Sequence, residues 1–441
     1  MMDKYFQLQA RGANVKNEIY AGFVTFLAMS YILAVNPAIL GSIPGMDKGA
    51  VFTATALSAA IATFIMGFFA NYPVMLAPGM SMNSFFKGML VSGAITLAWN
   101  EALLGIFISG VIYFFFSLTP ARRIIIEAIP NDLKYGIAVS LGLFLTFLGL
   151  KNSGIITANP FVLVQLGDIF NPQVAIALIS IFIAIGFMVR GIKLATVISF
   201  VAAVLLSILS DKVLGTSLLT LPDALFSVPP SIAPTFGAIF DVSQLTLPDL
   251  TSLFFIVLIF FIVDFFDGLS TIVGVGRDAG IITDDKVPNA KAALVADSGG
   301  TIIGTLLGTT SITCFSESGV ASSLGAKTGL SAITTAAFFL LSLFLYPLFS
   351  IFTTAIVAPA MVIIGIYMIG NVAHVDWEKP QFRVSVFFTM IFSLLTFSPA
   401  NGMAIGFISY CFVMLVLGKG KEVHPLIYGL GVLFFAYLVI L

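Results

Sequence analysis

Residues 77–83 read APGMSMN, and residues 309–319 read TTSITCFSESG. Each stretch opens a short apolar run with a proline, a glycine or several hydroxyl side chains, which break a helix or compete for its backbone hydrogen bonds. Each also belongs to the third apolar run of its half of the chain. Short, interrupted runs at matching positions of two halves are typical of transporters whose site lies near the middle of the bilayer.

The composition around these stretches is that of a membrane protein. Of the 441 residues, 59% are hydrophobic and only 9% are charged, whereas a soluble domain carries about 25% charged residues. Apolar runs of about 18 to 25 residues recur along most of the chain. They lack the strict alternation of barrel strands, so helices are the expected spanning elements. We predict an all-α polytopic membrane protein with about 14 transmembrane segments.

The longest break between runs lies at 211–249, where several aspartates and prolines predict an extramembrane linker. Residues 1–210 hold seven apolar runs, and residues 250–441 hold seven more followed by a C-terminal hydrophobic segment. Because seven is odd, the second half starts on the opposite side of the membrane, and we expect two inverted repeats with short broken segments 3 and 10. A further apolar run at 424–441 leaves open whether the chain ends in a span or in a surface helix.

The distribution of basic residues predicts the orientation. If the N-terminus is cytoplasmic and each run crosses once, most of the 20 Lys and Arg fall on the cytoplasmic side, as the positive-inside rule requires. The first run, at 21–40, is too long for the apolar core of a signal peptide and lacks a cleavage site. We therefore expect a multi-pass protein of the cell membrane, an inner membrane in a prokaryote.

Several classes of function are disfavoured. A net charge of −1 gives no basis for nucleic-acid binding. The two cysteines lie within apolar runs and form no disulfide framework, and two histidines make a metal site improbable. The chain contains no H-E-x-x-H, G-x-S-x-G or Walker motif. We expect no enzyme activity, no catalytic residue and no cofactor.

Three acids stand out because they lie well inside apolar runs: Asp264, Asp267 and Glu317. A carboxylate at a helix centre costs about 2.5 to 3.5 kcal/mol, so a functional role is the leading interpretation. Asp264 and Asp267 are three positions apart and share one helical face. The alternative is that these acids bond neighbouring hydroxyls or open backbone, and that Asn83 only closes a backbone gap. Glu101 and Asp297 are placed near run ends, with interfacial or packing roles.

Aromatic residues and glycines flank these polar positions. Phe265, Phe315, Phe85 and Phe86 are candidates for stacking on a planar solute, although each taken singly fits a packing role. The residues 300, 304 and 308 are glycines at four-residue spacing, which predicts close approach of another helix.

The chain resembles the permeases of the nucleobase-ascorbate superfamily, and most closely the azaguanine-resistance branch of adenine/guanine/hypoxanthine permeases. The resemblance covers nearly the whole chain and is carried by residues 14–37, by 77–80 followed by Asn83, by the Asp264/Asp267 pair before Gly268, and by 309–319 with Glu317. One departure is Ser84, where such permeases commonly have a small apolar residue. The added hydroxyl is expected to change pocket polarity.

The resemblance implies a fold and a set of site residues. Spans 1 to 4 and 8 to 11 would form a substrate-carrying core, and the remaining spans a gate or dimer scaffold, compatible with a homodimer in the lipid bilayer. The substrate would lie between short strands of spans 3 and 10. Asp264 and Glu317 would be the main purine ligands, with Asn83 opposite. Asp267 would support binding or couple protons, a role shared with Asp264. The predicted substrate contacts also include Met80, Phe265 and Thr313.

The chemistry of the residues agrees with these implications. A purine is planar, neutral and rimmed by N–H donors and nitrogen acceptors, which carboxylates, an amide and aromatic rings can match. Carboxylates near the midplane can also exchange protons in step with substrate. The resemblance, with which this chemistry agrees, therefore implies a secondary active transporter that imports adenine, guanine or hypoxanthine by proton symport. The alternatives are a uracil or xanthine permease, and an anion transporter of the same fold, whose substrate the buried acids would repel.

Overall fold

The computed structural model describes residues 2–91, 97–119, 128–192, 194–219, 224–241, 243, 249–282, 288–351 and 354–440. Parts of the predicted linker, at 220–223, 242 and 244–248, lie outside these residues. The helices begin where the sequence supplies caps. Asn14 and Asp47 accept the backbone N–H of Lys16 and Ala50 at the first turns of two helices, and prolines open others.

The first half follows the order that the sequence predicted. After α1 (Met2–Phe6), its seven crossing segments are α2 (Val15–Met29) with α3 (Ile32–Leu40), α4 (Lys48–Ile65) with the π-helix η1 (Met66–Ala70), β1 (Leu76–Pro78) with α5 (Met80–Val91), α6 (Trp99–Leu118), α8 (Asn131–Asn152), α9 (Pro172–Val189) and α10 (Ala195–Leu214). A hairpin of β2 (Ile156–Asn159) and β3 (Leu163–Leu166) joins α8 to α9.

The second half repeats this order. Its segments are α11 (Asp249–Asp278), α12 (Ala290–Leu307), β4 (Ile312–Cys314) with η3 (Ser316–Ser318) and α13 (Gly319–Ser323), α14 (Gly329–Ser342) with η4 (Leu343–Leu345) and α15 (Tyr346–Ser350), α16 (Thr354–Ile369) with η5 (Gly370–His374), α17 (Pro380–Leu395) and α18 (Pro399–Val416). The short helix η2 (Ala238–Phe240) precedes this half, and η6 (Gly420–Glu422) and α19 (Pro425–Ile440) follow it. Among the described residues, 8 helical segments are long and apolar enough to cross a membrane by themselves.

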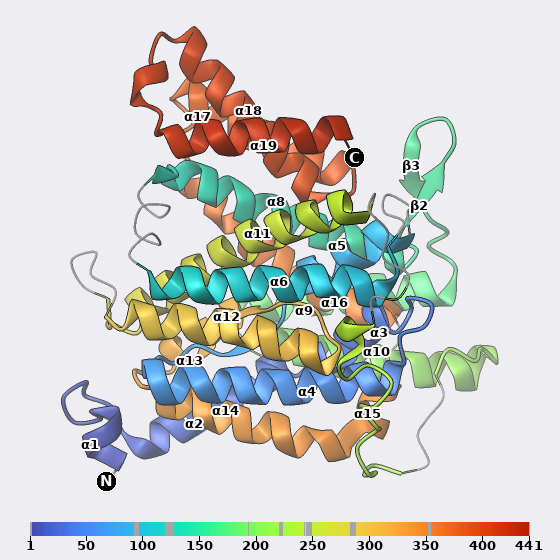
Figure 1. The fold of residues 1–441 in the computed structure, drawn as a ribbon. Coiled ribbons are helices and arrows are strands. Elements are labelled where there is room, and N and C mark those ends of the chain that lie inside the picture. Colours follow the sequence, from blue (N-terminus) through green and yellow to red (C-terminus); the bar gives the residue numbers. More distant parts are fainter. Residues whose placement is uncertain are drawn as a thin grey trace.

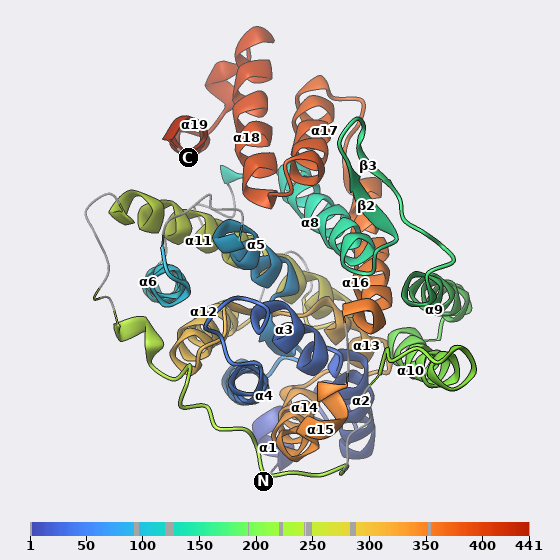
Figure 2. The same cartoon turned by 90° about the vertical axis from the view of Figure 1, so that its right-hand side faces the viewer.

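The packing partners reveal the repeat. Helix α14 packs on α2 and α4, and its counterpart α6 packs on α11 and α12. Figure 1 shows these core helices side by side, and Figure 2 views many of them end-on, with α9 and α10 at one edge, α17 and α18 at another, and α8 and α16 between. The prediction of a helical membrane protein built from two matching halves is confirmed.

The two broken segments meet in a two-stranded antiparallel sheet. The register places Leu76 opposite Cys314, Ala77 opposite Thr313 and Pro78 opposite Ile312. A strand inside a membrane protein must have its backbone groups satisfied by protein, since no lipid atom can bond them. The outer edge of β1 is bonded by the Thr63 hydroxyl of α4, which contacts both N and O of Leu76 at 2.9 Å.

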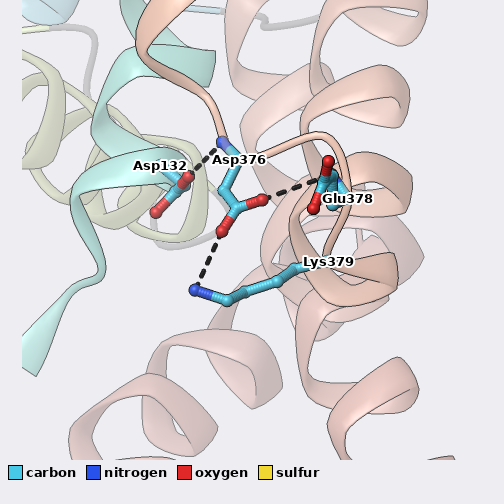
Figure 3. A network of polar contacts seen from close by, with 4 residues as sticks. All are labelled: Asp132, Asp376, Glu378 and Lys379. Carbon is cyan, nitrogen blue, oxygen red and sulfur yellow. Dashed lines mark hydrogen bonds and ion pairs between the residues drawn. The ribbon is translucent and has the colours of Figure 1, made fainter.

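A polar cluster ties the start of α8 to the loop before α17 (Figure 3). Asp132, in the first turn of α8, accepts the backbone N–H of Asp376 at 2.7 Å. Asp376 forms an ion pair with Lys379 at 2.9 Å. The hydrogen bond from Lys379 holds the pKa of Asp376 below its usual value. This cluster positions the loop before α17. Because the side chains of Asp376 and Lys379 are exposed, their ion pair adds little to the stability of the fold.

Candidate functional site

The β1–β4 sheet brings together the two broken segments of the chain, β1 with α5 and β4 with η3. Helix α5 starts directly after β1, and η3 follows β4, so residues distant in sequence converge on one small region. The predicted site residues Asn83, Asp264, Asp267, Thr313 and Glu317 all lie on these elements or on α11, which packs against β4 and η3.

Asn83 lies in the first turn of α5 and is fully buried. Its Nδ2 donates to Oδ1 of Asn36 at 2.5 Å. Asn36, in turn, donates to Thr55 at 2.7 Å and to Thr309 at 2.9 Å, which links spans 1, 2, 3 and 10. Within the described part of the chain, the Asn83 Oδ1 has no hydrogen-bond partner. The neighbouring Ser84 hydroxyl, the departure noted in the sequence, is likewise buried and unpartnered there.

Asp264 and Asp267 both face β4 from α11. Asp264 is 1% exposed, and its Oδ2 lies 2.7 Å from the Thr301 hydroxyl on α12. Its Oδ1 is buried without a hydrogen-bond partner among the described residues. Asp267 is less buried and accepts the Thr313 hydroxyl at 3.3 Å. The pair therefore presents one carboxylate deep in the core and one closer to the surface of the site.

Glu317 lies at η3, just past the strand, and is partly exposed. Its Oε1 accepts the hydroxyl of Tyr31 at 2.5 Å, and its Oε2 accepts the Ser316 hydroxyl at 3.3 Å. Tyr31 occupies the break between α2 and α3, and sequence reasoning did not identify it. Neither proline nor glycine marks the break at Ser30 and Tyr31, so the sequence carries no clear signal for this partner.

The placement of Asp297 near a run end is wrong. It lies in the middle of α12, fully buried. Its Oδ2 accepts the Tyr113 hydroxyl at 2.9 Å, and its Oδ1 accepts the Cys314 thiol at 3.3 Å. Gly268 makes this position possible, because a Cβ at that residue would collide with the Asp297 carboxylate. Glu101, by contrast, is a helix-end residue that accepts the backbone N–H of Ala98 at 3.0 Å.

Strand geometry separates the carboxylates. Successive side chains of a strand point to opposite faces, so Thr313 and Cys314 lie on different sides of β4. Asp267 bonds the first and Asp297 bonds the second. Asp267 and Asp297 therefore lie on opposite faces of β4, with a hydroxyl and a thiol as their partners.

The aromatic and apolar residues predicted to contact substrate differ in their surroundings. Phe265 is fully buried, with its ring edge-on to Tyr113 at 5.6 Å and to Phe116 at 5.5 Å between centroids. The contacts of Phe265 are thus those of a packing residue, and its contact with substrate stays a prediction. Phe315 lies beside the site, 6.5 Å from the Tyr31 ring. Met80 is the first residue of α5 and is 4% exposed.

The glycines of α12 allow both a strand, β4, and a helix, α4, to approach α12 closely. A Cβ at Gly300 would lie 3.0 Å from Ala62 of α4 and 3.0 Å from Ile312 of β4. A Cβ at Gly304 would lie 2.7 Å from Ile312 and 3.0 Å from the Thr310 carbonyl. The glycines expected to pack against another helix therefore also pack against β4.

Known proteins match this chain over its full length. A family described as "Permease family" matches residues 16–419. The guanine/hypoxanthine permease PbuG of Bacillus subtilis (strain 168) is 41% identical over 450 residues, which cover 100% of both chains. The adenine permease AdeP of Escherichia coli (strain K12) is 34% identical over 435 residues, covering 98% of this chain and 95% of that protein.

The fold also matches a solved structure. The transmembrane domain of the cyanobacterial bicarbonate transporter BicA aligns with a TM-score of 0.67 at 15% identity, covering 89% of this chain and 97% of that chain. At this identity the likeness concerns the fold alone. The sequence matches show that the chain is a multi-pass membrane protein and belongs to the permease family of nucleobase-ascorbate transporters, whose members are transporters rather than enzymes.

Proposed function

We propose that this protein imports purine nucleobases, namely adenine, guanine or hypoxanthine, by proton symport across the cell membrane. The N-terminus would face the cytoplasm, and in a prokaryote the membrane would be the inner one. The observation that carries the proposal is the meeting of β1 and β4 beside two buried acceptors, the Oδ1 atoms of Asn83 and Asp264, which have no hydrogen-bond partner among the residues that the structure describes. A purine supplies N–H donors that would satisfy such acceptors, and a buried acceptor left unsatisfied costs about 1–3 kcal/mol.

The proton part of the proposal rests on the acids. A neutral purine cannot be concentrated by the membrane potential alone, so its accumulation needs a coupled ion. Asp264 and Asp297 are buried, whereas Asp267 and Glu317 are partly exposed. This gradation offers proton acceptors at different depths around β4, with Asp267 and Asp264 as the coupling pair. The similarity to the guanine/hypoxanthine permease PbuG and the adenine permease AdeP supports purines as the substrate class.

Transport by purified protein in proteoliposomes tests the proposal. Labelled hypoxanthine, guanine and adenine are expected to accumulate when the outside is made more acidic, and a protonophore should abolish the accumulation. Excess unlabelled uracil, xanthine or bicarbonate should compete poorly. Competition by uracil or xanthine but not by purines would favour the pyrimidine or xanthine alternative, and competition by bicarbonate alone would favour an anion transporter. The mass of the detergent-solubilised protein tests the expected homodimer.

A further inference from the structure

Two threonines hold the outer edges of the two strands in the same way. Thr63 of α4 contacts both N and O of Leu76 on β1 at 2.9 Å. Thr301 of α12 contacts the Ile312 carbonyl on β4 at 3.0 Å and the Ile312 amide at 3.2 Å. Since α4 and α12 belong to the second crossing segments of the two halves, these threonines are counterparts in the repeat. Both are fully buried.

The counterparts differ in one respect. The Thr301 hydroxyl also lies 2.7 Å from Oδ2 of Asp264, whereas the Thr63 hydroxyl bonds the backbone of Leu76. A hydroxyl has one hydrogen to donate and two lone pairs that accept. Thr301 therefore has two acceptors, the Asp264 carboxylate and the Ile312 carbonyl, competing for a single hydrogen. Thr63 meets no such competition in its bonds to Leu76.

Hydrogen counting connects this contact to the protonation state of Asp264. When Asp264 carries a proton on Oδ2, it donates to the Thr301 oxygen, and Thr301 is free to donate to the Ile312 carbonyl. When that proton leaves, Asp264 can only accept, so Thr301 turns its hydrogen to the carboxylate. The Ile312 carbonyl, which is fully buried, then loses its donor, and an orphaned buried carbonyl is costly. One proton on Asp264 thus changes the bonding of the strand edge.

We propose that the Thr301 hydroxyl is a positioning switch, which makes the hydrogen bonding of β4 depend on whether Asp264 is protonated. The inference rests on the proposed proton symport and deepens it. Beyond Ile312, β4 continues into Thr313, which bonds Asp267, and the chain then reaches Glu317. A change at the edge of β4 is therefore carried directly to the substrate side of the strand.

Other titratable groups surround Asp264 and share its electrostatic environment. They are Asp267 on the same helix, Asp297 on α12, Tyr113 on α6, Cys314 on β4 and, beyond Asp267, Glu317 on η3. Among these groups, Asp267 and Glu317 bond other hydroxyls, and Asp297 bonds Tyr113 and Cys314. Thr301 bonds both the Asp264 carboxylate and the Ile312 backbone and so joins the two, and the Ser311 hydroxyl just before the strand also lies close to Asp264.

The test compares three variants in proteoliposomes: Thr301→Val, which keeps the shape and removes the hydroxyl, Thr301→Ser, which restores it, and Thr63→Val, the matched control on β1. Uptake of labelled hypoxanthine is measured with and without an inward proton gradient, together with counterflow in the absence of a gradient. We expect Thr301→Val to retain counterflow but to lose gradient stimulation by about fivefold or more. Thr301→Ser and Thr63→Val should keep that stimulation.

Equilibrium binding of hypoxanthine in detergent at several pH values gives a second readout. Wild-type affinity should depend on pH, and Thr301→Val should flatten that dependence. Stimulation of Thr301→Val equal to wild type, or an equal loss in Thr63→Val, would overturn the switch. If wild-type uptake ignores the gradient, the proposed symport fails. In that case, pH-dependent binding that needs the Thr301 hydroxyl would still support the switch, and binding that ignores pH would overturn both.

Discussion

Leu76 lies directly opposite Cys314 in the sheet that joins the two halves of the chain. The flanking bonds, from Phe315 N to Met75 O at 2.9 Å and from Gly79 N to Ser311 O at 3.1 Å, make Leu76 and Cys314 a non-hydrogen-bonded pair. Such pairs bring their Cβ atoms close together. The two residues thus fix the register on which the site assignment depends.

A disulfide at this pair is the first prediction. In a Cys411→Ser background, Leu76→Cys should form a disulfide with the native Cys314 on mild oxidation, because cross-strand Cβ atoms of such pairs approach the distance that a disulfide requires. The bond is measured after proteolytic cleavage between the halves, when the fragments should stay linked without reductant. Adding Cys314→Ser is the control and should abolish the link. Free fragments from the oxidised Leu76→Cys protein would contradict the register.

The second prediction concerns Glu317. Replacement by Gln keeps the shape but removes the charge that a substrate N–H would bond, and charged hydrogen bonds contribute about 1.5–3 kcal/mol. We expect Glu317→Gln to raise the half-saturating concentration of hypoxanthine by more than about tenfold, with normal membrane expression. The exposed Glu378→Gln is the matched control and should behave as wild type. Wild-type uptake by Glu317→Gln would remove this residue from the site.

Asp267 carries the third prediction. It is partly exposed and contacts Thr313, so it can exchange a proton with the aqueous side of the site. Asp267→Asn should keep substrate exchange in counterflow but lose stimulation by an inward proton gradient. Paired uptake assays with and without protonophore measure the effect, and Asp376→Asn, in the loop before α17, is the control. Equal collapse of accumulation by protonophore in Asp267→Asn and wild type would place coupling elsewhere.

The fourth prediction addresses packing at β4. Gly304→Ala would place a Cβ 2.7 Å from the Ile312 side chain and 3.0 Å from the Thr310 carbonyl. Overpacking of this kind costs about 1–3 kcal/mol, so thermal unfolding in detergent should occur at a lower temperature and uptake should fall. Gly299→Ala, whose Cβ would meet nothing within 4 Å, should melt like wild type. Identical melting of both variants would show that α12 and β4 are further apart.

Local sequence properties determined the architecture. Apolar run length predicted the spans, and the proline, glycine and hydroxyl residues at 77–83 and 309–319 predicted the breaks, since hydropathy and helix breaking act over a few residues. The cost of a carboxylate inside an apolar run identified Asp264, Asp267 and Glu317 for the same reason. All three lie beside β4 in the structure.

Only the tertiary structure decided which groups these residues meet. Tyr31 bonds Glu317, Asn36 bonds Asn83, and Thr301 bonds both Asp264 and Ile312. Asp297 proved to be central because the packing of α12 against α6 and β4 buries it, although its place in the sequence suggested a helix end. Phe265 shows the converse, because it adjoins Asp264 in sequence but turns into an aromatic cluster. A partner across a helix bundle is set by the packing of segments far apart in the chain, and no local pattern encodes that contact.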